Sequence, residues 1–382
     1  MGKTLLKTIL VLSLARILHA EETPLSAALR EFATGQIEGK EVAGLLVEVG
    51  DKDGVLASAA AGYANIETEE KTSPGNIFWI ASMSKPVTGT AMMMAVEKGL
   101  VSISDPVSKY LPEFKDLKGA DGKPATITIG QCLSHTSGLQ DLNAEENGAT
   151  TSLAELTALV STKPLKFEPG TKWAYCQTGI NTAARVIEVV SGKSFPDYLR
   201  ENLFAPLGME NTTFHLTEAQ ARRLAISYQT TETGFQPVAP FILFGKSPTD
   251  TNRYPCGAGG LFSTLSDYGT FARMILNGGE LDGKRYLEPE SIAGMTSSHT
   301  GGLAVGFVPG SNYGLGWIRV AEPGGVTEPL SEGSFGHGGA YGTQAWIDPV
   351  KNRYTILMLQ RTNFGNGDAS DTRGLFQKAA AK

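Results

Sequence analysis

One serine and one lysine in this sequence are spaced so that they can activate a nucleophile. Ser82 and Lys85 form an S-x-x-K at the start of an apolar, methionine-rich stretch that is typical of a helix. Because residues three apart share a helix face, we expect the hydroxyl beside the amine, at a helix N-terminus with exposed backbone N–H groups. Such a pair suits acyl transfer if the amine loses its proton near neutral pH.

Two further segments carry groups that an activated serine needs. Tyr175 could act as a base if a nearby ammonium lowered the pKa of its phenol. Segment 337–340 is rich in glycine, so its backbone can approach a substrate closely, and the Ala340 N–H can form half of an oxyanion hole. Each pattern also has an ordinary explanation: a solvated helix start, a half-buried aromatic side chain, and a turn in a chain with 45 Gly.

Composition excludes several other classes of protein. The chain has 382 residues and a formal net charge of −6 with no basic cluster, which argues against a nucleic-acid partner. No apolar run after the N-terminal segment is long enough to span a membrane. The cysteines, Cys132, Cys176 and Cys256, are odd in number and widely spaced, so we predict neither a disulfide framework nor a C-x-x-C metal site.

The N-terminus resembles an export signal. Lys3 and Lys7 precede a short apolar core at residues 9–15, and the small residue Ala20 lies at the expected cleavage point, just before the first acidic pair. Arg16 interrupts the apolar run, so a poorly ordered N-terminal helix is the alternative. We expect residues 1–20 to be a signal peptide and the mature chain to be periplasmic or secreted.

Periodicity predicts strands at both ends of the chain and short helices between them. The order favours an α+β fold in which a central antiparallel sheet is flanked by helices and carries a mostly helical insertion. We place a discontinuous α/β lobe at residues 21–110 and 253–382, a helical lobe at 111–252, and a ligand site between them. The predicted elements are a strand pair at 42–62, helices at 82–99 and 183–190, a long surface loop at 230–252, a strand at 313–318, a hairpin at 343–347 and 354–359, and a closing helix at 372–381.

The order of the three chemical segments resembles the serine β-lactamase and penicillin-binding protein superfamily. Its pattern is S-x-x-K, then Y-x-N, then K-T-G or H-x-G. The likeness is greatest to the branch with class C β-lactamases, similar DD-peptidases and family VIII carboxylesterases, and the stretches at 129–139, 206–212, 259–264 and 313–317 support it. The three motifs are Ser82-Met83-Ser84-Lys85, Tyr175-Cys176-Gln177 and His337-Gly338-Gly339.

The resemblance implies a β-lactamase/transpeptidase-like fold and a role for each motif. Ser82 would be the acylated nucleophile, and Lys85 and Tyr175 would share the acid and base work. The backbone N–H groups of Ser82 and Ala340 would form the oxyanion hole. His337, with the two glycines after it, would position the substrate and tune Tyr175. No metal or organic cofactor is implied. His135, in the stretch at 129–139, is expected to be a buried hydrogen-bonding residue.

Two departures from the family pattern bear on the substrate. Gln177 replaces the asparagine that is thought to bind the substrate's side-chain amide, and His337 replaces a lysine. Lysine is cationic near neutral pH whereas histidine is largely neutral, so a substrate carboxylate loses a dependable counter-charge. Both changes favour an ester over a β-lactam or a peptide that ends in a carboxylate.

Three functions therefore compete. The first is a serine hydrolase that works through an acyl-enzyme, namely a carboxylesterase with broad acyl substrates in which weak β-lactam hydrolysis can persist. The second is a DD-peptidase, a D-amino-acid peptidase or a class C-type β-lactamase. The third is a non-hydrolysing module that recognises peptidoglycan or penicillin. The intact Ser82, Lys85 and Tyr175 argue against the third.

Overall fold

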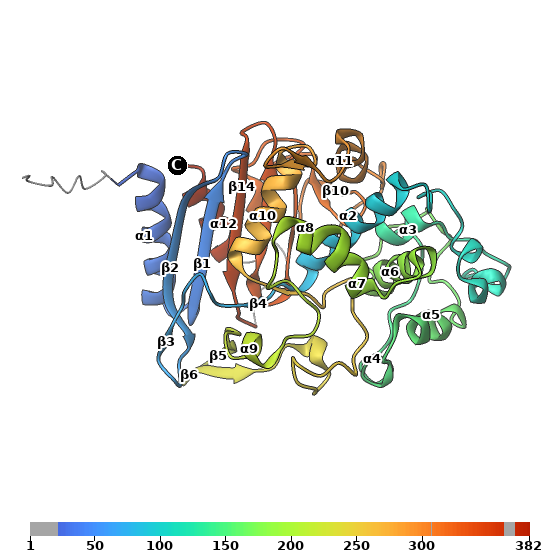
Figure 1. Cartoon of the computed structure of the whole chain (residues 1–382), viewed down its shortest axis with the longest axis horizontal. Helices are drawn as coiled ribbons and strands as arrows, with labels where there is room; N and C mark the ends of the chain where they lie inside the picture. Colours follow the sequence, from blue (N-terminus) through green and yellow to red (C-terminus); the bar gives the residue numbers. More distant parts are fainter. Residues whose placement is uncertain (1–21, 307, 363–370) are drawn as a thin grey trace, which may run out of the picture.

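The computed structural model describes residues 22–306, 308–362 and 371–382, so the predicted signal peptide lies outside the described residues. An eight-stranded antiparallel sheet is built from both ends of the chain, which confirms the predicted architecture (Figure 1). The predicted strand pair at 42–62 and the hairpin at 343–359 are both present. The strand order is β10 (Ser311–Tyr313), β11 (Ile318–Val320), β12 (Phe335–Gly338), β13 (Gln344–Asp348), β14 (Arg353–Leu359), β1 (Gly44–Gly50), β2 (Val55–Asn65) and β3 (Glu70–Lys71).

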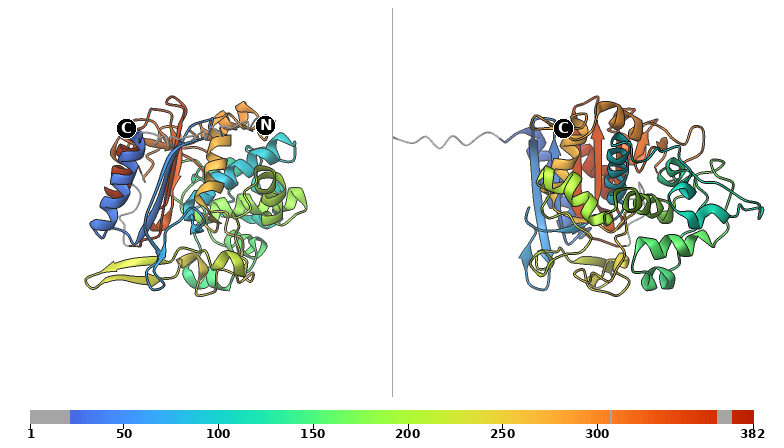
Figure 2. Two further views of the ribbon diagram at one scale, coloured as in Figure 1. Left: turned by 60° about the vertical axis from the view of Figure 1, so that its left-hand side comes forward. Right: turned by 45° about the vertical axis from the view of Figure 1, so that its right-hand side comes forward.

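Helices cover both faces of this sheet (Figures 1 and 2). The helices α1 (Pro24–Glu38) and α12 (Asp371–Ala380) pack on one face, where they bury Leu45 and Val47 of β1. Helix α10 (Leu265–Leu276) lies on the opposite face, where Leu46 joins the main core. A strand that is buried on both faces must be apolar at successive positions, which explains the Leu45-Leu46-Val47 run. The predicted closing helix is α12.

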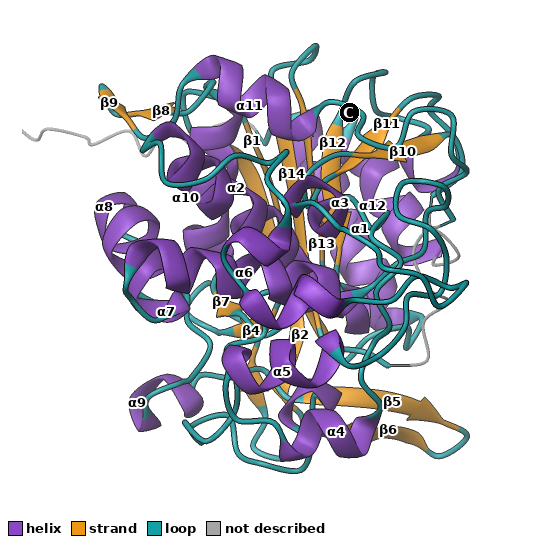
Figure 3. Ribbon diagram, turned by 90° about the vertical axis from the view of Figure 1, so that its right-hand side faces the viewer, coloured by secondary structure: helices purple, strands orange, loops and turns teal. Residues whose placement is uncertain are grey.

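The segment between the two sets of sheet strands is mainly helical and lies in front of the sheet in Figure 3. Its longest helix is α6 (Gln177–Ser191), which includes the predicted helix at 183–190. Gly192, in the left-handed conformation, caps its C-terminal end. In the described part of the chain, no helix is long and apolar enough to cross a membrane. The remaining elements are α2 (Ser84–Glu97), α3 (Ile129–Leu133), α4 (Ala144–Ala149), α5 (Leu153–Ser161), α6 (Gln177–Ser191), α7 (Phe195–Leu199), α8 (Ala205–Leu207), α9 (Glu218–Ala221), α11 (Pro289–Thr296), the short strands β4 (Phe78–Trp79), β5 (Ser227–Thr231), β6 (Gly234–Val238), β7 (Phe262–Ser263), β8 (Glu280–Leu281) and β9 (Lys284–Arg285), and the short turns η1 (Ala81–Met83), η2 (Val107–Lys109), η3 (Pro112–Asp116), η4 (Arg200–Phe204), η5 (Phe241–Leu243), η6 (Gly325–Thr327) and η7 (Ala340–Gly342).

Helix α2 is buried around most of its circumference and passes through the middle of the molecule. Two glycines let it pack directly on the turn between β10 and β11. A Cβ atom on Gly89 would lie 2.0 Å from the carbonyl oxygen of Leu315, and one on Gly316, whose φ is +84°, would lie 2.5 Å from the carbonyl oxygen of Lys85. This close backbone packing fixes the helix that follows Ser82.

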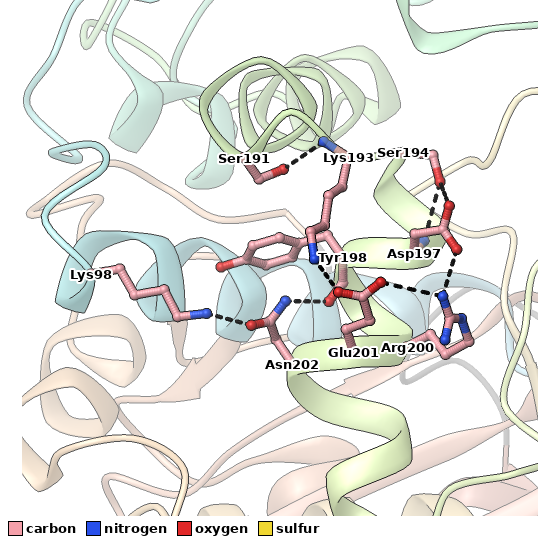
Figure 4. A network of polar contacts seen from close by, with 9 residues as sticks. All are labelled: Lys98, Ser191, Lys193, Ser194, Asp197, Tyr198, Arg200, Glu201 and Asn202. Carbon is pink, nitrogen blue, oxygen red and sulfur yellow. Dashed lines mark hydrogen bonds and ion pairs between the residues drawn. The ribbon is translucent and has the colours of Figure 1, made fainter.

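A polar network lies on the surface near the C-terminal end of α2 (Figure 4). It includes the ion pair Lys193–Glu201 and a hydrogen bond from Lys98 to Asn202. Both partners of the ion pair are more than a third exposed, so solvent screens it and its contribution to stability is small. The network joins α2 to the α7–η4 segment and contains no residue of the candidate site.

Two predicted elements are wrong in detail. The predicted strand at 313–318 is a hairpin of β10 and β11, because Gly316 adopts a positive φ and the Gly314 N–H donates to the Trp317 carbonyl at 2.8 Å. The predicted surface loop at 230–252 begins with the hairpin β5–β6, since Gly234 supplies the positive φ of its turn. The lobe boundaries at 110/111 and 252/253 remain a prediction.

Buried Glu48 predicts an unusual pH dependence of stability. It lies on β1 facing α10, accepts a hydrogen bond of 3.0 Å from the Tyr354 hydroxyl, and burial raises its pKa to about 7. The folded state therefore binds more protons than the unfolded state between about pH 4.5 and 7. The free energy of unfolding should fall across that window, by up to about 3 kcal/mol, and stay low above it.

The variant Glu48→Gln keeps an acceptor for Tyr354 but cannot ionise. We expect its unfolding free energy, measured by urea denaturation at pH 4.5 to 8, to lose this slope and to exceed that of the wild type at pH 8. The exposed Glu31→Gln serves as the control and should keep the wild-type slope. A Glu48→Gln curve parallel to the wild-type curve would show that Glu48 does not titrate in this window.

Candidate active site

Ser82 lies in a short helical turn that leads directly into α2. The turn η1 follows β4, and Ala81 at its start has a φ of +47°, an unfavourable conformation for a residue with a Cβ atom. Ser84 holds the turn in place, since its hydroxyl donates to the Ala81 carbonyl at 2.7 Å and accepts from the Leu261 N–H at 3.1 Å. Ser82 therefore lies at a helix N-terminus, as predicted, and the strained residue Ala81 directly precedes it.

The Lys85 amine is completely buried and touches three oxygen atoms. Its Nζ lies 3.0 Å from Ser82 Oγ, 2.8 Å from Gln177 Oε1 and 2.6 Å from the Ala258 carbonyl oxygen. Burial lowers the pKa of Lys85 to about 7, although Cys256, Asp141 and Cys176 act in the opposite direction. A neutral amine has two N–H bonds, which the amide and carbonyl oxygens can accept, so its lone pair faces the Ser82 hydroxyl.

Tyr175 approaches the same serine from the helical side of the site. Its hydroxyl donates to Ser82 Oγ at 2.7 Å, and Lys85 Nζ lies 4.5 Å from the centre of its ring. Burial raises the pKa of the Tyr175 phenol well above its ordinary value. The sequence left open whether Lys85 or Tyr175 is the base, and a Tyr175 phenolate is not favoured here, because desolvation outweighs any attraction to the neighbouring amine. Tyr175 is a proton donor in this geometry, and Lys85 is the group suited to accept a proton.

The segment after β12 lies against the turn that carries the serine. A Cβ atom on Gly339 would lie 2.4 Å from the Ile80 carbonyl oxygen, so only glycine allows this approach. The Arg373 guanidinium of α12 donates to the carbonyls of Gly339, at 2.5 Å, and Thr343, at 3.0 Å. These bonds fix both ends of η7, which contains Ala340. Ser82 and Ala340 line the same cavity, as the predicted oxyanion hole requires.

His337 and Gln177 are both part of the site, and each has a protein partner. His337 is 3% exposed and its Nε2 lies 2.9 Å from the Tyr313 hydroxyl. Burial lowers the pKa of His337 to about 3, which supports the prediction that the side chain at this position carries no positive charge near neutral pH. The side-chain oxygen of Gln177 contacts Lys85. Its predicted role as a substrate-binding residue remains a prediction, as do the roles of Gly338 and Gly339, which line the cavity.

A cavity of about 500 Å³ contains the reacting groups. Ser82, Tyr175 and His337 lie on its wall with apolar side chains on either side. Phe241 packs edge-on against buried Trp79 and Tyr341, which places the 241–244 segment at this cavity. The apolar part of the lining comprises Trp79, Leu142, Phe241, Ile242, Phe244, Val308, Ile318, Val326 and Trp346.

Sequence reasoning missed several groups that the fold brings to this site. Arg373 lies in a predicted helix far along the chain, and nothing in its local sequence indicates the site. Asp141 lines the cavity, and one of its carboxylate oxygens accepts from the Thr178 N–H at 2.9 Å. Tyr313 lies in a stretch that supported the family resemblance, which was the available signal. Within the described residues, no three His, Cys, Asp or Glu side chains are grouped so that they could hold a metal ion.

Fold and site together define a β-lactamase-fold protein with an S-x-x-K serine. The sequence profile of the β-lactamase family matches residues 29–380, and the chain belongs to this family. Its relatives and structural neighbours are described as penicillin-binding proteins, β-lactamase-like proteins, an esterase and an acyltransferase, so it belongs to the β-lactamase-fold serine hydrolase superfamily.

Individual relatives cover most of the chain. Penicillin-binding protein 4 of Amycolatopsis lactamdurans is 32% identical over 295 residues, which span 76% of this chain and 73% of the relative. Protein Rv1367c of Mycobacterium tuberculosis is 27% identical over 349 residues, 84% of this chain and 86% of that protein. The structure of EstCE1, described as a hydrolase with promiscuous acyltransferase activity, aligns with a TM-score of 0.79 at 24% identity over 94% of this chain and 98% of EstCE1, and supports the fold alone.

Proposed function

We propose that this protein is a carboxylesterase that hydrolyses uncharged esters through an acyl-enzyme on Ser82. The observation that carries the proposal is the placement of Ser82 Oγ between a buried amine at 3.0 Å and a phenol that donates to it at 2.7 Å. A nucleophile with its base and a proton donor on the same oxygen is suited to acyl transfer.

In the proposed acylation step, Ser82 loses one proton and the leaving alcohol gains one, with Lys85 and Tyr175 as the carriers. The Ser82 oxygen attacks the ester carbonyl carbon while its proton passes to the neutral Lys85 amine. The backbone N–H groups of Ser82 and Ala340 donate to the oxygen that becomes negative. The C–O bond to the alcohol then breaks, Tyr175 protonates the leaving alkoxide, and the Lys85 ammonium returns a proton to the phenol. Water repeats the sequence on the acyl-enzyme.

The cavity supports an ester substrate more than an anionic one. Its lining is largely apolar, and β12 contributes neutral His337 where the K-T-G form of the family pattern has a lysine. An apolar cavity of this size can enclose the acyl and alcohol parts of an ester without a counter-charge.

One observation favours a second candidate, a peptidase or β-lactamase that acts on carboxylate-bearing substrates. Arg373 lines the same cavity close to Gly338, where a Cβ atom would lie 3.2 Å from the guanidinium carbon. A guanidinium at this place can attract a carboxylate, even though it also donates to the carbonyls of the 339–343 segment.

A substrate panel separates the candidates. We expect the purified chain to hydrolyse p-nitrophenyl butyrate with a kcat/KM at least about tenfold above that for a chromogenic cephalosporin or a D-Ala-D-Ala peptide, a difference of about 1.4 kcal/mol in transition-state stabilisation. Mass spectrometry of the quenched reaction should show one acyl group per chain. A preference for the cephalosporin or the peptide would establish the second candidate. Absence of both turnover and adduct would indicate a recognition module.

We also propose, on the sequence of residues 1–20 alone, that the protein is exported to the periplasm or secreted.

A further inference from the structure

Four hydrogen bonds form an unbroken buried chain between the two motifs that flank the nucleophile. The Cys176 backbone N–H donates to His135 Nδ1 at 3.1 Å, and His135 Nε2 lies 3.1 Å from the Tyr313 hydroxyl. The same hydroxyl lies 2.9 Å from His337 Nε2, and His337 Nδ1 lies 2.6 Å from the Gly338 carbonyl oxygen. His135, Tyr313 and His337 are each at most 3% exposed.

The direction of every bond in this chain follows from its two ends. A backbone N–H can only donate, so His135 Nδ1 carries no proton, and neutral His135 must donate from Nε2 to the Tyr313 oxygen. A carbonyl oxygen can only accept, so His337 Nδ1 carries the proton, and the lone pair of neutral His337 Nε2 accepts from the Tyr313 hydroxyl. The two deductions agree at Tyr313, which accepts one bond and donates one.

We infer that Tyr313, held by His135, is a positioning residue that keeps His337 Nε2 free of a proton and the imidazole neutral. With His337 neutral, no cation develops at this position of β12. The consequence for the substrate rests on the proposed function: an uncharged acyl group is preferred there over one that carries a carboxylate.

Adding a proton to His337 would reverse the chain. Protonated Nε2 would donate to Tyr313, whose hydroxyl would then have to donate to His135 Nε2. That requires a proton on His135 Nδ1, which faces the fixed Cys176 N–H. Either a buried hydrogen bond is therefore lost, or Tyr313 accepts from both imidazoles and its own O–H is left buried without an acceptor, and both outcomes are unfavourable.

The charged and titratable groups around His337 act in the same direction. Lys85 of α2 and Arg373 of α12 both lower the pKa of His337, after the larger effect of burial, and only the Gly338 carbonyl raises it. The pKa of His135 is also well below its ordinary value, mainly because of burial. Both imidazoles are therefore neutral near pH 7, mainly because they are buried.

The same chain touches the proton donor of the reaction. The His135 ring packs against the Tyr175 ring with centroids 4.5 Å apart, and the Tyr175 and His337 rings are 6.2 Å apart. Cys176, whose N–H begins the chain, directly follows Tyr175 in the sequence. Tyr313 thus links the strand that carries the substrate-facing glycines to the segment that carries the phenol.

Nitrogen NMR of histidine-labelled protein tests the inference directly. In the wild type between pH 5.5 and 8, we expect His135 in the Nε2-protonated form and His337 in the Nδ1-protonated form. In Tyr313→Phe, the Gly338 carbonyl still holds the Nδ1 proton, but His337 Nε2 should take up a second proton at a higher pH than in the wild type. The control Tyr354→Phe removes a different buried hydroxyl of the same sheet and should leave both tautomers unchanged.

Kinetics supply the second measurement. We compare two esters, p-nitrophenyl butyrate and mono-p-nitrophenyl glutarate, of which the second carries a carboxylate. The measured quantity is the ratio of their kcat/KM values, because the titration of Lys85 affects both substrates equally and cancels in the ratio. At pH 5.5, the ratio for Tyr313→Phe should shift about tenfold towards the glutarate, whereas the ratios for the wild type and Tyr354→Phe should not depend on pH.

Two results would overturn the inference: an Nε2-protonated or charged His337 in the wild type, or, in folded Tyr313→Phe, an unchanged pH of His337 protonation together with an unchanged substrate ratio. If Tyr313→Phe does not fold, the wild-type tautomers alone decide the question. If the wild type hydrolyses no ester, the proposed function fails, while the NMR measurement still decides the state of His337.

Discussion

Replacing Ser82 by alanine should abolish the acyl adduct and lower kcat for p-nitrophenyl butyrate by about four orders of magnitude or more. Ser82 Oγ contacts both Lys85 Nζ, at 3.0 Å, and the Tyr175 hydroxyl, at 2.7 Å. Without it, Lys85 has no hydroxyl to deprotonate, and the Tyr175 hydroxyl loses its hydrogen bond to Ser82. The measurement is intact-protein mass spectrometry after a rapid quench, combined with steady-state kinetics.

Ser84, two positions further along, provides a matched control. Its hydroxyl bonds to the Ala81 carbonyl and to the Leu261 N–H and does not touch the cavity. Ser84→Ala should therefore still form the adduct, although the unpaired Leu261 N–H should reduce the free energy of unfolding by about 1–3 kcal/mol. An acyl adduct that persists on Ser82→Ala would show that another residue is the nucleophile.

Replacing Lys85 by methionine should lower kcat/KM by about three orders of magnitude and remove the acidic limb of its pH profile. The amine must be neutral to accept the Ser82 proton, and burial lowers its pKa to about 7. Wild-type kcat/KM should therefore fall as the pH drops below about 7, where Lys85 becomes charged. Methionine fills nearly the same volume without a charge, so the protein should remain folded.

The control for this variant lies at the other end of the same helix. Lys98 is exposed and contacts Asn202 on the surface, so Lys98→Met should keep both the rate and the acidic limb. If Lys85→Met retained activity within tenfold of the wild type, Tyr175 would have to be the acceptor of the first proton. The raised pKa of its phenol argues against that outcome.

Local patterns in the sequence predicted the elements that carry the chemistry. The sequence predicted a strand within 42–62, which the structure shows as β1 with residues 45–50 buried, and the predicted helix at 183–190 is part of α6, which carries Gln177 at its first position. The two errors, at 230–252 and 313–318, both fall where a single glycine turns the chain into a hairpin. A left-handed glycine leaves little trace in the periodicity of apolar residues, so the hairpins could not be separated from a loop and a longer strand.

The partners of the predicted residues were much harder to predict. The Ala258 carbonyl, the Arg373 guanidinium and the Tyr313 hydroxyl each come from a distant part of the chain, and each reaches the site only in the folded structure. Even the roles of Lys85 and Tyr175 were undecided in the sequence, because a pKa depends on burial and on neighbouring charges.

By itself, the sequence determined which residues can react: one S-x-x-K, a tyrosine and a glycine-rich H-G-G segment, in an order that identifies the family. The tertiary structure decided which group takes a proton and which gives one. Burial lowers the pKa of the Lys85 amine to about 7. Burial also raises the pKa of Tyr175, so the phenol keeps its proton. The physical reason is that desolvation, which sets both protonation states, exists only after distant segments have packed together.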